Sequence, residues 1–187
     1  LGIDVILDFA FMNTEHPITE KGTFMGVDNL AESDEFRPYY IAVGKMDADK
    51  VGDLFLSMAP SLSRYITISE LFQFFFGGLA YSLAQVGKIV VRIPGEEGFA
   101  RRESEKYKEK LVVLYSGGDD VAVYGNYVHV LHFLSLLRSA IRYVLPSVTC
   151  SAGVVIDDPK VPIAILYRNS IELMEAKAKE YDERDSF

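Results

Sequence analysis

The sequence is short of cysteine, of positive charge and of long apolar runs. Its 187 residues include one cysteine, Cys150, which excludes an internal disulfide. Cys150 lies in an apolar stretch, so we expect a buried thiol. A single unpaired thiol suits a reducing environment, and we expect a cytoplasmic protein.

Basic residues are outnumbered by acidic ones. Lys and Arg total 19, Asp and Glu total 27, and the formal net charge is −8. This balance argues against a groove on this surface that binds nucleic acid directly. It leaves room for a nucleotide that binds through metal ions, because the ions bring their own positive charge.

No apolar run is suited to crossing a membrane. The longest, residues 71–86, is interrupted by Gln73, Ser82 and Gln85 and is too short and too polar. No secretory signal is recognised, and we expect no membrane partner. Hydrophobic residues make up 49% of the chain, enough for the core of one ordinary domain.

The most distinctive stretch that is present is LVVLYSGGDDVAVYG, residues 111–125. Its two β-branched and aromatic runs, 111–115 and 121–124, predict two strands. Gly117 and Gly118 between them permit the backbone angles of a tight turn. The stretch therefore predicts a β-hairpin.

Carboxylates gather at the tip of this hairpin and at the end of another expected strand. Asp119 and Asp120 follow the glycines, and adjacent carboxylates need a cation or a hydrogen-bond donor nearby. The strand at 39–46 is followed by Asp47 and then by Asp49. The hairpin alone is equally compatible with a solvated turn. Together, the two elements have the layout of a two-metal nucleotidyl-transfer palm.

The remaining pattern completes an α+β fold. We expect an irregular N-terminal arm or linker over residues 1–37 and a palm domain over residues 38–187. Further strands are predicted at 87–93 and 148–156, helices at 49–59, 68–86, 126–145 and 162–181, a connector at 61–69, and a charged loop or solvated hairpin extension at 94–110. This order predicts a ferredoxin-like palm, with a mixed or antiparallel sheet and helices on one face. The other face would be left for a partner or for substrate.

The order of several segments resembles a known family. YIAVGKMDADKVGDLF, SRYITISELFQFFF, LYSGGDDVAVYG, TCSAGVVI and PIAILYRNSIELMEAKAKEYD follow one another between residues 38 and 182. This series resembles the GGDD-containing palm (polymerase/cyclase) domain of the large subunit of type III CRISPR effector complexes. The resemblance implies conversion of ATP to cyclic oligoadenylates once the complex binds target RNA.

The resemblance also implies a metal site. Two Mg²⁺ or Mn²⁺ ions suit hard oxygen ligands, for which we expect Asp47, Asp119, Asp120 and the carbonyl of Ala48. The three aspartates are the expected catalytic residues. On a regular strand Asp119 and Asp120 point to opposite faces, and we favour Asp119 for metal and Asp120 for the turn. Asp49 is either a further ligand or a helix cap.

Nucleotide contacts are expected around the same tip. A helix that starts near Lys50 offers N–H groups to phosphate, and glycines allow close approach. Lys177, in MEAKAKEY, matches the lysine that GGDEF-like palms place near the phosphates, but it is equally compatible with a lysine at the edge of a helix. The expected nucleotide-binding residues are Ser116, Gly117, Gly118, Lys50, Val51 and Lys177.

Two alternatives stay open. One is a GGDEF-like or class III nucleotide cyclase, although Asp120 replaces the glutamate of GGDEF enzymes and DADKVGDLFLSMAPSLSR departs from their pattern. The other is a non-catalytic assembly palm, which the intact acidic set disfavours. A catalytic palm would need a second palm domain and the other subunits of a CRISPR ribonucleoprotein, which would also contact crRNA and target RNA.

Overall fold

The fold is organised around a four-stranded antiparallel sheet. The computed structural model describes residues 26–33, 37–58, 61–86, 88–95 and 98–178. The sheet has the order β4-β5-β1-β6, and a separate two-stranded sheet pairs β2 with β3. The strands are β1 (Ile41–Ala48), β2 (Lys88–Gly95), β3 (Gly98–Lys106), β4 (Leu111–Gly117), β5 (Asp120–Asn126) and β6 (Cys150–Asp157).

Helices connect and cover these strands. They are α1 (Val27–Ala31), α2 (Val51–Met58), α3 (Leu62–Phe72), η1 (Gln73–Leu79), α4 (Ala80–Val86), α5 (Tyr107–Lys110), α6 (Tyr127–Val144), α7 (Ile163–Leu173) and η2 (Met174–Ala178). The path from β1 through helices and the β2–β3 hairpin to the β4–β5 hairpin, and then through α6 to β6, gives a ferredoxin-like topology for the main sheet. The expected α+β palm with an antiparallel sheet is confirmed.

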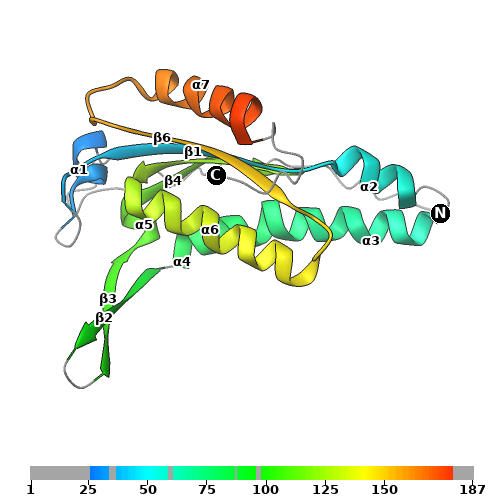
Figure 1. The fold of residues 1–187 in the computed structure, drawn as a ribbon, viewed down its shortest axis with the longest axis horizontal. Coiled ribbons are helices and arrows are strands. Elements are labelled where there is room, and N and C mark those ends of the chain that lie inside the picture. Colours follow the sequence, from blue (N-terminus) through cyan, green and yellow to red (C-terminus); the bar gives the residue numbers. More distant parts are fainter. Residues whose placement is uncertain (1–25, 34–36, 59–60, 87, 96–97, 179–187) are drawn as a thin grey trace, which may run out of the picture.

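The prediction that helices lie on one face only is wrong in part. The crossover helices α3, α4 and α6 share one face, where they pack with Ala42 and Met46 of β1. On the other face, Ile41 and Val43 pack with Leu166 of α7 and with α1. In Figure 1, α7 runs along one side of β6 and β1, and α6 and α3 lie on the opposite side. The reason is that both faces of β1 are apolar, so both must be covered.

The long helical segment starts earlier than its sequence predicted. Residues 62–69, expected as a connector, are already helical, and the Ser61 side chain accepts from the Arg64 N–H as an N-cap. The turns then widen to a π-helix through Gln73–Leu79 before α4. By length and composition alone, Leu62–Gln85 could cross a membrane. Phe72, Phe75 and Phe76 of this segment are buried in the core, whereas residues 62–67 are exposed.

The charged segment 94–110 extends a hairpin, which confirms that alternative over a plain loop. The hairpin pairs Arg92 with Arg101 and Ile93 with Ala100, and Figure 1 shows it projecting away from the main sheet. The short helix α5 returns the chain to β4.

The helix α6 follows the predicted pattern, with Asn126 as its cap. The Asn126 side chain accepts from the Val128 N–H at 3.1 Å and donates to the Ala31 carbonyl at 2.8 Å. The second bond ties α1, part of the expected arm, to the end of β5. The boundary between residues 37 and 38 stays a prediction.

The close approach of α7 and η2 to the sheet depends on Gly153. A Cβ on this residue would lie 2.0 Å from the Ser170 carbonyl oxygen and 2.7 Å from the Met174 nitrogen. We expect Gly153→Ala to lower the free energy of unfolding by about 3 kcal/mol, because backbone atoms cannot yield as a flexible side chain can. Urea denaturation measures this change.

Gly78→Ala is the matched control. A Cβ on Gly78 would meet no atom within 4 Å, and the residue is exposed in η1. We expect it to be neutral or to stabilise by up to about 1 kcal/mol. Equal effects of the two substitutions would contradict the packing of α7 described above.

Candidate functional site

The expected acidic residues meet at one edge of the main sheet. Asp47 near the end of β1 is the cross-strand partner of Asp120 at the start of β5. One residue further, the Ala48 N–H donates to the Asp119 carbonyl at 2.9 Å. The strand end and the hairpin tip therefore form one hydrogen-bonded unit.

Asp119 and Asp120 face opposite sides of the sheet, as the strand geometry predicts. Asp119 lines a pocket with Val51 of α2 and Phe72 of α3, on the face that α6 covers. Asp120 is directed to the other face, and by register it is the side-chain neighbour of Asp47. The preference for Asp119 as the metal ligand stays a prediction. The residue that the register places beside Asp47 is Asp120 and not Asp119.

A compact polar cluster holds the Asp120 carboxylate. Lys45 Nζ lies 2.6 Å from Asp120 Oδ2, and the Tyr115 hydroxyl donates to the same oxygen at 2.6 Å. Lys45 also donates to the Tyr115 hydroxyl at 2.5 Å. Burial first, and then the hydrogen bond to Asp120, raise the pKa of Tyr115 far above its usual range, so the hydroxyl keeps its proton and remains a donor.

Sequence reasoning missed Lys45 and Tyr115. The signal was a lone lysine in an otherwise apolar strand, two residues before Asp47 and therefore on the same face. Because β1 pairs with the β4–β5 hairpin, Lys45 contacts Asp120 and Tyr115 of that hairpin.

Asp49, the residue after β1, is buried and bonded to Thr149 and Ser151. It is 6% exposed, and its carboxylate accepts from the hydroxyls of Thr149 and Ser151 at 2.9 Å each. Its N–H donates to the Thr149 carbonyl at 2.8 Å. Asp49 thus fastens the turn after β1 to β6, beside Asp47.

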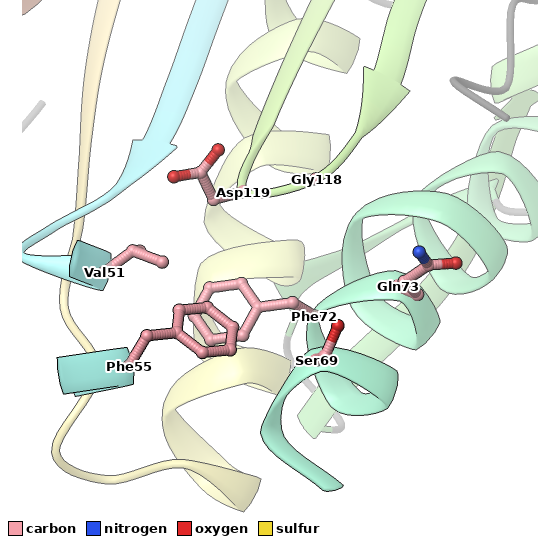
Figure 2. Close-up of a pocket in the computed structure, with 7 residues that line it drawn as sticks. All are labelled: Val51, Phe55, Ser69, Phe72, Gln73, Gly118 and Asp119. Atoms are coloured by element: carbon pink, nitrogen blue, oxygen red, sulfur yellow. The ribbon is translucent and has the colours of Figure 1, made fainter. Parts of the chain in front are cut away.

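A pocket opens next to the hairpin tip. Its cavity volume is about 250 Å³, and it is lined by Val51, Phe55, Ser69, Phe72, Gln73, Gly118 and Asp119. Figure 2 shows Asp119 at one end, the rings of Phe55 and Phe72 side by side, and Ser69 and Gln73 on the helix opposite. The pocket therefore combines an apolar wall, two neutral polar side chains and one carboxylate.

The structure places some of the expected nucleotide-binding residues at this pocket. Gly118 lies in the turn with φ +62°, and no atom lies within 4 Å of the Cβ it lacks, so it leaves open space beside Asp119. Val51 lines the pocket at the start of α2. Lys50 precedes it, exposed and with φ 54°, and Gly117 ends β4.

The other two expected contacts differ. Ser116 is fully buried, and its hydroxyl donates to the Phe76 carbonyl of η1. Ser116 therefore anchors the π-helix to β4, and its expected nucleotide contact is corrected. Lys177 lies in η2, and its side chain is outside the described residues.

The donors at this edge fit a hard divalent ion by chemistry. Carboxylate oxygens of Asp47 and Asp120 stand on neighbouring strands, and Mg²⁺ and Mn²⁺ prefer such oxygens. Within the described part of the chain, no three Asp, Glu, His or Cys side chains already meet as a metal site. The expected trio is thus divided into the pair Asp47–Asp120 and the separate Asp119, and their role as ligands stays a prediction.

Known proteins with similar sequences share one description. The CRISPR system single-strand-specific deoxyribonuclease Cas10/Csm1 (subtype III-A) of Methanocaldococcus jannaschii is 28% identical over an alignment of 168 residues that covers 84% of this chain and 20% of that protein. The protein of the same description from Streptococcus thermophilus is 29% identical over an alignment of 152 residues that covers 76% of this chain and 17% of the other. The chain spans about a fifth of the length of these relatives.

Solved structures share the fold. A Csm1–Csm4 cassette in complex with one ATP superposes with a TM-score of 0.70 at 22% identity, over 91% of this chain and 23% of the other. Csm1 of T. onnurineus gives 0.69 at 22% identity, over 95% of this chain and 25% of the other. The model of the Cas10/Cmr2 second palm domain matches residues 40–187, and the chain therefore belongs to this family.

Proposed function

We propose that this palm converts ATP to cyclic oligoadenylates by nucleotidyl transfer, within the large subunit of a type III CRISPR complex that has bound target RNA. The observation that carries the proposal is the in-register pair Asp47–Asp120, at the same end of the sheet as the pocket that Asp119 lines. Structures of similar Csm1–Csm4 cassettes in complex with ATP, AMPPNP, cA3 and cA4 support it.

The reaction joins the 3′-hydroxyl of one nucleotide to the α-phosphorus of another. The new P–O bond forms as the bond between the α-phosphorus and the pyrophosphate oxygen breaks, so that pyrophosphate leaves and the hydroxyl proton passes to solvent water. Two Mg²⁺ or Mn²⁺ ions would lower the pKa of the attacking hydroxyl and stabilise the negative charge on the attacking and leaving oxygens. Asp47 and Asp120 would hold them, with the Ala48 carbonyl and Asp119 as further ligands.

The pocket would receive the base end of one nucleotide. Its volume, about 250 Å³, is below the roughly 300–1,000 Å³ usual for whole ligands, so the phosphates would lie outside it, toward the acidic edge. Phe55 and Phe72 offer apolar surface to adenine, and Ser69 and Gln73 offer hydrogen bonds to its edge. The N-terminal N–H groups of α2 would face phosphate.

A facing palm would complete the site. A second palm domain is the partner expected from the sequence. Because this chain itself matches the second palm domain, the partner we propose is the other palm of the pair. Large apolar side chains stay exposed on α2, α3 and η1, the helices that contribute to the pocket, and they offer surface for such a partner: Leu56, Leu62, Tyr65, Ile66 and Phe74. RNA would be bound elsewhere in the complex, consistent with the formal net charge of −8.

One test of this proposal concerns the acidic pair. We expect Asp47→Asn and Asp120→Asn each to lower oligoadenylate synthesis from ATP in the assembled complex about 100-fold or more, because each removes an ion ligand. Mass spectrometry of products formed from ATP or GTP with Mn²⁺ measures this loss, and it separates the proposal from a GGDEF-like cyclase.

Asp157→Asn is the control. Asp157 ends β6 opposite Ile41, at the far end of β1 from the acidic edge, and is exposed. Oligoadenylate synthesis by the Asp157→Asn protein should stay at the level of the unmodified protein. Full synthesis by a folded Asp47→Asn protein would instead favour a non-catalytic assembly palm, so a thermal scan accompanies each assay.

Another test of this proposal concerns the pocket. We expect Gln73→Leu to raise the KM for ATP about five- to tenfold with little change in kcat, because a hydrogen bond to the base is lost while the acidic pair is untouched. Gln85→Leu, in α4 and outside the pocket, is the matched control. A change confined to kcat would show that the base binds elsewhere.

A further inference from the structure

Lys45 occupies the position where a positive charge would be needed before any ion binds. It lies two residues before Asp47 on β1, so both side chains project to the same face. Its Nζ is 2.6 Å from Asp120 Oδ2, and its side chain is 14% exposed, against 25% for Asp120. A lysine so far withdrawn from water is costly unless it is paired, so this contact is a built feature of the edge.

The geometry leaves one oxygen of Asp120 outside the cluster. The contacts described for this carboxylate, from Lys45 and from the Tyr115 hydroxyl, both end on Oδ2. Tyr115 in turn accepts from Lys45, which closes a triangle of polar atoms. The triangle fixes the side chain of Asp120 next to its cross-strand partner Asp47.

The charges at this edge explain why such a contact is needed. Asp47 and Asp120 are direct cross-strand neighbours, and like charges in this arrangement repel. Lys45 offsets that repulsion in the protein without ions. When a divalent ion arrives, the ammonium becomes an extra positive charge close to it and competes for the same carboxylate.

We propose that Lys45 is the resident counter-ion of Asp120, that it competes with the divalent ion for this carboxylate, and that it thereby sets the ion concentration at which the site fills. The inference rests on the proposed function, because it concerns the ions of that site. If the ion pair were purely structural, it would stabilise the fold, and removing the charge of Lys45 would leave the affinity for the divalent ion unchanged or lower it. The two roles therefore predict opposite results when the charge of Lys45 is removed.

The test is Mn²⁺ binding to the complete protein with its partner subunits, followed by electron paramagnetic resonance of free Mn²⁺. The Asp47→Asn protein supplies the baseline, so that only ions at this edge are counted. We expect the ion site of the Lys45→Met protein to fill at an Mn²⁺ concentration at least about tenfold lower than that of the unmodified protein, since one neighbouring charge shifts such equilibria by roughly one to three powers of ten. Lys45→Arg keeps the charge and should stay near the unmodified protein.

Lys160→Met is the matched control, because Lys160 is exposed in the turn after β6. It should bind Mn²⁺ as the unmodified protein does. If Lys45→Met fails to fold, Tyr115→Phe takes its place. It removes one acceptor from Lys45 and one donor from Asp120, and we expect filling at about a threefold lower concentration.

Two results would overturn the inference in different ways. Unchanged or weaker Mn²⁺ binding by a folded Lys45→Met or Tyr115→Phe protein would make the cluster purely structural and leave the proposed function standing. An unmodified protein that binds no more Mn²⁺ than the Asp47→Asn baseline would overturn the proposed ion site, and this inference with it.

Discussion

The pairing of β1 with strands on both sides is the constraint on which the rest of the structure depends. Seven successive residues of β1 are aligned with β5, and the whole strand is aligned with β6. A shift of one residue would turn every side chain to the opposite face. The buried apolar residues on both faces of β1 oppose such a shift, because it would exchange two differently shaped sets of core contacts.

That fixed register gives the site its composition. It places Asp120 beside Asp47, Ala48 beside Asp119, and Ser151 where its hydroxyl reaches Asp49. The polar residues thus gather where the apolar core of the sheet ends. The core fixes their positions through the register of the strands, although its own side chains are apolar. The division of Asp119 and Asp120 between two faces gives one carboxylate to the pocket and the other to the cluster around Lys45.

Much of this arrangement could be predicted from local patterns. The β-branched runs around Gly117 and Gly118 identified the hairpin, and Asn126 identified the start of α6, because these signals act within a few residues. The second layer of helices was missed because an amphipathic helix such as α7 does not show which face of a sheet it covers. Ser116 was misassigned because its burial depends on η1, forty residues earlier in the chain. Lys45 became recognisable only when its partner across the sheet was known.

The missing side chain of Gly153 has a consequence for how the molecule moves. With Ser170 and Met174 in backbone contact range, α7 and η2 leave no space for water or a side chain between themselves and β6. The middle of β6 therefore cannot open while α7 and η2 stay packed against it. We expect the amide hydrogens of the middle of β6 to exchange with solvent only in the rare, largely unfolded states of the domain. The strand that fastens Asp49 is thus among the slowest-opening parts of the chain, although it lies at an edge of the sheet.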